Sequence, residues 1–189
     1  FCIQEGSGGW FPIGAFRQVS LELCDFYRQE IPLYALVKKE NASMHAEALG
    51  QLIAEHRKIG AQMIYSSALT IQKEFRKDRE VAQTILELVP ALTHFDMLTY
   101  NIKTTLGAAA PRFKTDLTFK KWGYEPIVHN GVALGPFTRK SIDEKNDPAL
   151  ALKFSTASQY TLDCYNKHRS KIDGQTFVGR NLSDLKKAA

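Results

Sequence analysis

Apolar residues recur at helical spacing along much of the chain. In the stretches 44–56 and 79–89 they fall three and four positions apart, which is the spacing of one face of an α-helix. These residues are Ala48, Leu49, Leu52 and Ile53 in the first stretch, and Val81, Ala82, Ile85, Leu86 and Val89 in the second. Similar stripes run through 17–31 and 147–160, where Asp147 and Pro148 have the residue types of a helix N-cap and first position. The pattern predicts helices over all four stretches.

Two short segments have the composition of helix C-termini. RKIG (57–60) and KKWG (120–123) each place two basic residues and one apolar residue before a glycine. Basic side chains oppose the negative end of the helix dipole, and glycine adopts the left-handed conformation that commonly follows a helix. We therefore expect a helix to end at each glycine.

The spacing of these signals predicts a repeat. Further helices are expected over 64–75 and 98–110, and Tyr34, Tyr65 and Tyr100 recur at intervals of 31 and 35 residues. A helix pair that repeats with this period is typical of an α-solenoid. The sequence thus predicts an all-α, right-handed solenoid of seven to nine helices, with KKWGYEP at the boundary between two repeats. Residues 1–16 would form an N-terminal lead, 17–166 the repeat domain, and 167–189 a C-terminal tail or cap.

The solenoid hypothesis also predicts the core. Both helices of each pair should contribute apolar residues to one continuous interior. The expected core residues are Leu49, Leu52, Tyr65, Leu69, Ile85, Leu86, Tyr100, Leu106, Leu150 and Phe154.

Several segments resemble the pentatricopeptide repeat (PPR) family, whose units are 35 residues long. The resemblance lies in EALGQLIAEHRKIG (47–60), LTYN (98–101), LTFKKWGYEP (117–126) and ALALKF (149–154), and it covers 17–166 as about three to four degenerate units. Members of this family bind single-stranded RNA and read one base per repeat. The resemblance would place the reading residues at Ser66, Asp96 and Asn101. Ile127 occupies a position where a polar reader is expected, so most of the code is missing.

A degenerate code favours binding to a protein instead. The chain is similar to small PPR-type subunits of euglenozoan mitochondrial ATP synthases, which attach to the α subunit of the F1 headpiece. The resemblance implies a non-catalytic accessory subunit with that protein as partner. Binding of this kind depends on a few aromatic or arginine anchors, and the candidates are Arg112, Trp122, Tyr124 and Phe177. A small organellar RNA-binding protein is the alternative.

Composition agrees with either role. The net charge of +5 and the isoelectric point near 9.1 suit an acidic partner or nucleic acid. The three cysteines, Cys2, Cys24 and Cys164, are widely spaced, so we expect reduced thiols, with Cys24 and Cys164 in the core. No apolar run is long enough for a transmembrane helix. A mitochondrial location, with a targeting segment already removed, is the expectation.

Motifs for catalysis are weak. GSGG (6–9) is not followed by the Lys-Ser/Thr of a phosphate-binding loop, and the five histidines lack the spacing of zinc ligands. His94 and Asp96 are close in sequence, but no nucleophile has a convincing base partner. The sequence predicts a protein that is not an enzyme and holds no cofactor or metal.

Overall fold

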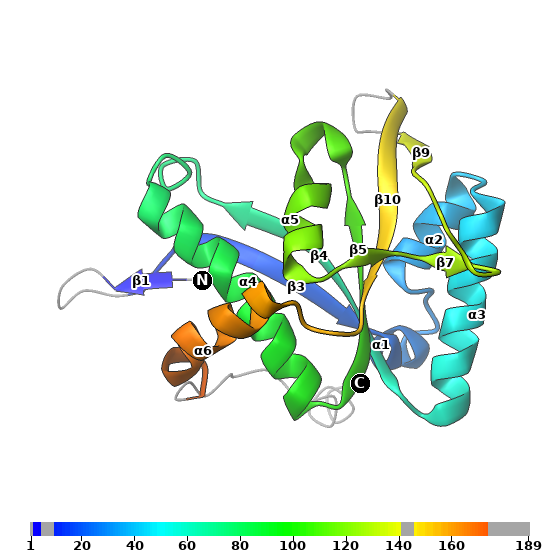
Figure 1. The fold of residues 1–189 in the computed structure, drawn as a ribbon, viewed down its shortest axis with the longest axis horizontal. Coiled ribbons are helices and arrows are strands. Elements are labelled where there is room, and N and C mark those ends of the chain that lie inside the picture. Colours follow the sequence, from blue (N-terminus) through cyan, green and yellow to red (C-terminus); the bar gives the residue numbers. More distant parts are fainter. Residues whose placement is uncertain (1, 5–9, 141–145, 174–189) are drawn as a thin grey trace.

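The structure, a computed structural model, describes residues 2–4, 10–140 and 146–173. It is a mixed α/β fold built on a six-stranded sheet (Figure 1), so the predicted all-α solenoid of PPR units is wrong. The sheet contains β3 (Gly14–Ser20), β4 (Gln62–Ile71), β5 (Ile102–Ala109), β6 (Glu125–Pro126), β9 (Phe137–Lys140) and β10 (Asn146–Phe154). Two small hairpins lie apart from it: β1 (Cys2–Gln4) with β2 (Trp10–Pro12), and β7 (Val128–His129) with β8 (Val132–Ala133).

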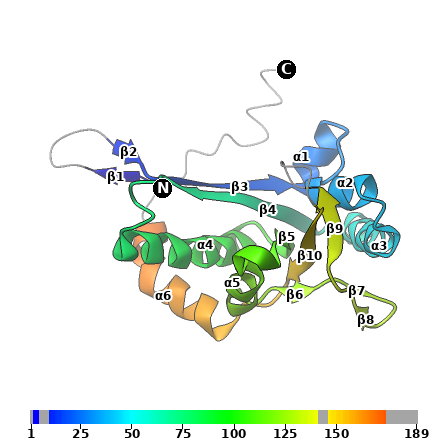
Figure 2. The ribbon, with the colours of Figure 1, turned by 90° about the horizontal axis from the view of Figure 1, so that it is seen from above.

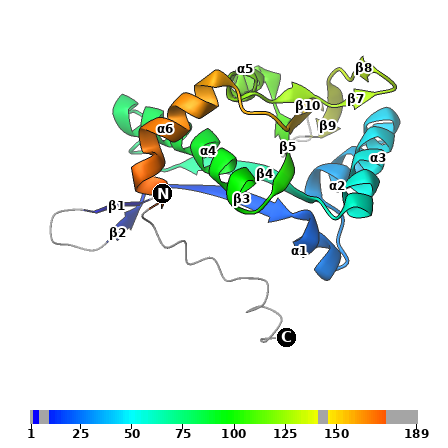
Figure 3. The ribbon, with the colours of Figure 1, turned by 60° about the horizontal axis from the view of Figure 1, so that its bottom comes forward.

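The helices cover the two faces of this sheet. One face carries α1 (Leu21–Phe26), α2 (Pro32–Lys39) and α3 (Ser43–Ile59), and the other carries α4 (Arg79–Thr99), α5 (Thr115–Trp122) and α6 (Gln159–Asp173). A short 3-10 helix, η1 (Pro111–Phe113), precedes α5. Figure 2 shows the two helical layers on opposite sides of the sheet, and Figure 3 shows α4 beside α6. Among the described residues, no helix has both the length and the apolar character needed to cross a bilayer.

The strand order is β3-β4-β5-β10-β6, and β9 pairs with the first half of β10. All of these pairs are antiparallel except β4–β5, which is parallel and is connected through α4. The β4–β5 pairing ends at Ser66 and Gly107. Beyond that point β4 continues alongside β3 and β5 continues alongside β10, so the two parallel strands diverge (Figure 1).

Each face of the sheet has its own apolar core. Leu33, Val37, Leu49 and Ile53 of α2 and α3 pack on one face against residues of β4, β5 and β10. On the other face, α4, α5, the segment after α5 and the strands contribute a group of buried residues, which are Val89, Ala109, Trp122, Tyr124, Leu152 and Phe154. Because β5 and β10 contribute to both cores, they are buried on both faces.

The helix α6 is held against α4 by a polar contact. The Glu87 carboxylate on α4 accepts hydrogen bonds from Lys167 Nζ (2.7 Å) and His168 Nε2 (2.9 Å) on α6. Together with Gln83, these donors lower the pKa of Glu87 to about 2. Lys167 and His168 stand at the start of 167–189, the predicted tail or cap, so the start of that segment belongs to the folded unit.

Three predicted helices are strands for a common reason. The segments 64–75, 98–110 and 147–160 correspond largely to β4, β5 and β10. Strands buried on both faces have nearly continuous apolar sequences, which resemble helical stripes over short distances. In β10, Ala149 and Ala151 face one core while Leu152 and Phe154 face the other. Asp147, the expected helix N-cap, is a strand residue.

Other expectations are confirmed. The helices α3 and α4 span the predicted stretches 44–56 and 79–89, although α4 continues ten residues further, to Thr99. Gly60 and Gly123 end α3 and α5 with φ of 64° and 105°. Cys24 and Cys164 are buried free thiols. Of the predicted core residues, Leu49, Tyr65, Ile85, Leu106 and Phe154 are buried, whereas Tyr100 is exposed.

Gly107 is required where α5 packs on β5, and its replacement tests the fold. A Cβ at this position would lie 2.6 Å from a ring carbon of Phe119 and 3.2 Å from one of Tyr124. Because these rings pack against each other, with centroids 4.6 Å apart, we expect Gly107→Ala to lower the free energy of unfolding by about 1–3 kcal/mol. Gly135→Ala is the control, since a Cβ there meets nothing within 4 Å. Urea unfolding measures both, and equal effects would contradict the described packing.

Candidate functional site

Within the described part of the chain, the helical layer α1–α3 leaves part of its sheet face uncovered. In Figure 2 these helices gather at one end of the sheet, and the opposite ends of β3 and β4 have a helix on one side only. Phe16 and Gln18 point toward α4. Phe16 packs in the core on that side of the sheet, and the Gln18 side chain partly opposes the rise that burial causes in the pKa of Asp96 on that helix. By alternation, Ala15 and Arg17 point to the uncovered face, where both are exposed. We call this region the open face.

A buried carboxylate organises two arginines near this face. Asp147, at the start of β10, has a fully buried side chain. Its Oδ2 accepts a hydrogen bond from Arg139 Nη2 of β9 at 3.0 Å, and its Oδ1 lies 3.2 Å from Arg112 Nε of η1. The side chains of Arg139 and Arg112 remain 30% and 42% exposed. The carboxylate thus fixes two guanidinium groups that still reach solvent.

The Tyr65 hydroxyl lies within electrostatic reach of both this ion cluster and Arg17 of β3. Tyr65 of β4 is buried, and burial raises the pKa of its hydroxyl, while the charges of Arg17 and Arg139 act in the opposite direction. The hydroxyl is therefore within electrostatic reach of both arginines. Arg17 is held in place from β4, since its Nε donates a hydrogen bond to Ser67 Oγ at 3.3 Å. We call Arg17, Arg112 and Arg139 the arginine row.

The arginine row has an excess of positive charge. Arg112 and Arg139 share the single buried carboxylate of Asp147, and Arg17 donates to the neutral Ser67 Oγ, so two of the three positive charges are uncompensated within this group. Arginine remains charged at any ordinary pH and forms paired hydrogen bonds with carboxylates and phosphates. Burying Asp147 has a desolvation cost that a surface pair would not have, so stability alone is a weak reason for this cluster. The arrangement is suited to holding an anionic group at the surface.

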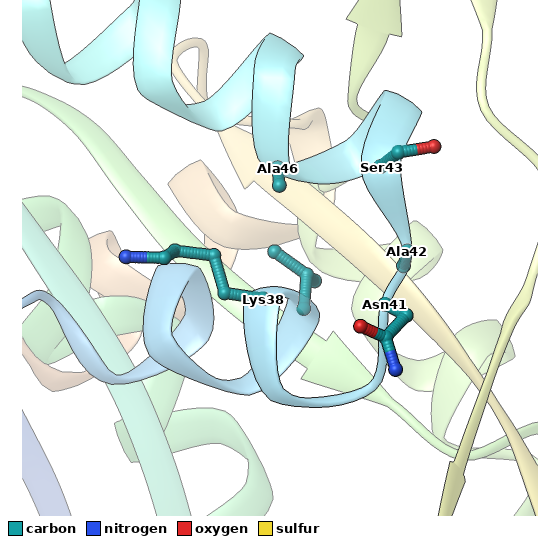
Figure 4. Close-up of a pocket in the computed structure, with 6 residues that line it drawn as sticks. Lys38, Asn41, Ala42, Ser43 and Ala46 are labelled. Carbon is teal, nitrogen blue, oxygen red and sulfur yellow. The ribbon is translucent and has the colours of Figure 1, made fainter.

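Two shallow hollows in the described surface are poor small-molecule sites. One, of about 330 Å³, lies between α2 and α3 and is lined by Val37, Lys38, Asn41, Ala42, Ser43 and Ala46. Figure 4 shows the polar ends of Lys38, Asn41 and Ser43 pointing in different directions, whereas a ligand pocket needs polar groups that converge. The second, of about 290 Å³, is lined by Gly14, Ala15, Thr70, Ile71 and Gln72. It lies at the end of the β3–β4 pair, on the same strands as Arg17.

The divergence of β4 and β5 is the usual place for a ligand in an open α/β sheet. In this protein that position is filled, because Phe119 and Tyr124 pack against Gly107 there. The N-terminus of α4, a potential phosphate site, is already capped by Asp78, whose Oδ1 accepts hydrogen bonds from the backbone N–H groups of Glu80 and Val81. Two acidic side chains at this helix end disfavour a phosphate. Within the described ranges, no group of three or more His, Cys, Asp or Glu side chains is placed to bind a metal.

The candidate docking residues differ in how far they are buried. Trp122 and Tyr124 are only 4% and 6% exposed and pack inside the core beneath α5, so their rings are not available to a partner in this fold. Arg112 is on the surface, as docking requires, with its guanidinium 4.4 Å from the centroid of the Phe113 ring. Phe177 lies outside the described residues.

The candidate RNA-reading residues do not form one surface. Ser66 is buried on β4, where its hydroxyl partly opposes the rise that burial causes in the pKa of Tyr124. Asp96 lies on α4, and burial raises the pKa of its carboxyl to about 6 although Gln18 partly opposes this. Asn101 is exposed at the turn before β5, with a positive φ of 53°. These three side chains are at different depths and on different elements.

The sequence reasoning missed Arg17, Arg139 and Asp147. Arg17 and Asp147 lie in stretches predicted to be helical, 17–31 and 147–160, and Arg139 was not among the candidate residues. A weak signal existed in β10, since Asp147, Ala149 and Ala151 alternate with larger residues in the manner of a strand. The pairing of Asp147 with Arg139 depends on strand register, which the sequence pattern did not specify.

A second surface is apolar rather than basic. The C-terminal ends of α1, α3 and α4 meet at the lower end of the molecule in Figure 1, because Gln62 pairs with Ile102 and Arg57 Nε donates a hydrogen bond to Asp25 Oδ2. Its exposed large apolar side chains are Phe26, Tyr27, Ile59, Leu98 and Tyr100. Such a group can mark an interface, but the structure gives no indication of what would cover it.

Comparison with known proteins adds no identity. No protein-family model matches the chain, and no curated protein matches it. The resemblance to the PPR family therefore has no support from relatives, and the α/β fold contradicts its architecture. The connection to ATP synthase was drawn from the same resemblance, and no relative supports it.

Replacement of Asp147 tests whether it organises the arginine row. Asp147→Asn removes the charge that two arginines share, so we expect the free energy of unfolding in urea to fall by roughly 2–3 kcal/mol. Asp25→Asn is the matched control, because Asp25 forms an exposed pair with Arg57 and should contribute less than about 1 kcal/mol. Equal losses of unfolding free energy in the two variants would show that the buried cluster contributes no more to stability than a surface ion pair.

The raised pKa of Asp96 predicts that this residue destabilises the native state to an extent that depends on pH. The native state retains the Asp96 proton up to about pH 6, whereas the unfolded chain releases it near pH 4, so this residue lowers stability as the pH rises through that interval. We expect Asp96→Asn to be more stable than the native protein at pH 7.5, by roughly 1–3 kcal/mol, and nearly equal at pH 4.

Urea unfolding at the two pH values checks this expectation. Glu55→Gln, at an exposed position on α3, should give a difference that hardly changes between them. A stability difference for Asp96→Asn that does not depend on pH would contradict the raised pKa.

Proposed function

We propose that this protein is a non-catalytic binding module that docks on an acidic surface of another protein through the arginine row of its open face. The observation that carries the proposal is the fully buried carboxylate of Asp147, which holds the guanidinium groups of Arg112 and Arg139, with the charge of Arg17 acting on the Tyr65 hydroxyl alongside that of Arg139. Complementary charge of this kind steers a partner and fixes its orientation. The net charge of +5 favours the same class of partner over the whole chain.

The open face favours a protein over single-stranded RNA. Nonspecific RNA sites interleave basic groups with exposed aromatic rings on which bases stack. Along the arginine row, Tyr65 is buried, and the exposed ring of Phe113 has the Arg112 guanidinium over it. The other aromatic residues that are exposed in the described part of the chain, Phe26, Tyr27 and Tyr100, lie at the apolar lower end. The residues expected to read bases are also not gathered on this face.

Two features support a role without catalysis. The position where parallel strands usually present a ligand is occupied by the protein's own aromatic side chains. The described hollows are shallow, and the polar groups around the one between α2 and α3 point in different directions. The mitochondrial location expected from composition stays a prediction.

The proposal is tested by comparing an acidic peptide with RNA. Poly-glutamate and poly-uridylate, each of twenty units and fluorescently labelled, are titrated with the full chain while anisotropy is measured at two salt concentrations. We expect the peptide to bind and Arg17→Glu to weaken it at least tenfold, equivalent to about 1.4 kcal/mol. Lys58→Glu is the matched control, since it makes the same charge change at an exposed site on α3.

A second variant removes a guanidinium without changing the net charge. Arg139→Gln combined with Asp147→Asn replaces the ion pair by two neutral side chains, so weaker binding in this variant cannot arise from net charge. Circular dichroism confirms that it is folded before binding is measured. Equal loss in Arg17→Glu and Lys58→Glu would contradict docking at the arginine row. Tighter binding of RNA that depends on the row would overturn the choice of a protein partner.

A further inference from the structure

The open face ends at β3, which forms one edge of the sheet in the described part of the chain. Among the described residues β3 pairs only with β4, so its other side carries no strand. An edge strand leaves the N–H and C=O groups of alternate residues without ladder partners, and these can pair with another chain. With seven residues, β3 extends about 23 Å, whereas the opposite edge of the sheet consists of the shorter β6 and β9.

The side chains of β3 leave room beside the edge on its open face. Ala15 and Arg17 are exposed there, and the small Ala15 borders the hollow of about 290 Å³. A new strand at this edge would lie about 4.8 Å from β3, and its alternate side chains would stand on the open face. The residue opposite Arg17 would then lie within reach of its guanidinium.

The charge of Arg17 selects what can add to this edge. Natural proteins place charged residues on edge strands to prevent two copies from pairing, and an arginine in each copy would have this effect. The same charge attracts a strand that carries a carboxylate at the facing position. The positive charge of Arg139 adds to that of Arg17 on this face, because both charges oppose the rise that burial causes in the pKa of the Tyr65 hydroxyl.

We propose that β3 binds an extended acidic segment of a partner protein, which joins the sheet as an additional strand. Acidic residues at alternate positions of the segment stand on the open face beside Arg17, and the backbone of the segment hydrogen-bonds with β3. This mode of recognition takes affinity from the main chain and specificity from alternate side chains. The inference rests on the proposed function and specifies the conformation and the pattern of the acidic partner.

The test changes the backbone of the ligand and leaves the protein intact. The probe is a nine-residue peptide in which glutamate alternates with valine and threonine. Its counterpart has the same sequence with N-methyl groups on alternate amides, which removes donors along one edge but retains every charge. Two counterparts, one for each set of amides, cover both possible edges. Fluorescence anisotropy measures the affinities, and hydrogen exchange followed by NMR reports on the amides of β3.

Addition at the edge predicts that one methylated counterpart binds at least tenfold more weakly than the parent peptide. The parent peptide should also slow hydrogen exchange in β3 and leave α3 unchanged, and Arg17→Glu should weaken its binding. If both counterparts bind as tightly as the parent while Arg17→Glu still weakens binding, edge addition is wrong and the proposed acidic docking stands. If no acidic peptide binds, or Arg17→Glu has no effect, both proposals fail.

Discussion

The antiparallel pairing of β5 with β10 is the interaction on which the rest of the fold depends. It joins five successive residue pairs, from Thr105 with Phe154 to Ala109 with Leu150, and both strands are buried on both faces. Through this pair the N-terminal part of the sheet, β3 and β4, is connected to the C-terminal strands. The contact also brings η1, which follows β5, close to the start of β10. Arg112 can therefore reach Asp147, so the basic cluster is a consequence of the central pairing.

The same constraint explains which parts of the fold could be predicted from sequence. Long amphipathic helices such as α3 and α4 and the glycines that end α3 and α5 depend on local preferences, and the predictions of these features were confirmed. Strands covered on both faces lack a regular alternation of apolar and polar residues to mark their period, so β5 and β10 resembled helices. Once these strands were taken as helices, the recurring tyrosines suggested a repeat that the molecule does not contain. Tyr65 lies in a strand, and Tyr100 lies just beyond the end of α4.

The candidate site was harder to predict because it depends on pairing between distant segments. Arg112 was selected as an anchor and is on the surface, but the carboxylate that fixes it is 35 residues away and belongs to another strand. Trp122 and Tyr124 were selected as aromatic residues at a corner, a description that fits a core residue as well as an anchor. Only their packing beneath α5 distinguishes the two roles. Basic residues at strand ends carry little information until the register is known.

The central claim is that an acidic partner docks on the open face, and the most direct measurement is an NMR titration of the full chain with a glutamate-rich peptide. Docking at the arginine row predicts that changes in backbone chemical shift concentrate in β3, the second half of β4 and β9, and that the Nε signals of Arg17 and Arg139 shift as well. Shifts centred on Phe26, Ile59 and Tyr100 at the apolar lower end, or spread evenly over all basic residues, would contradict it.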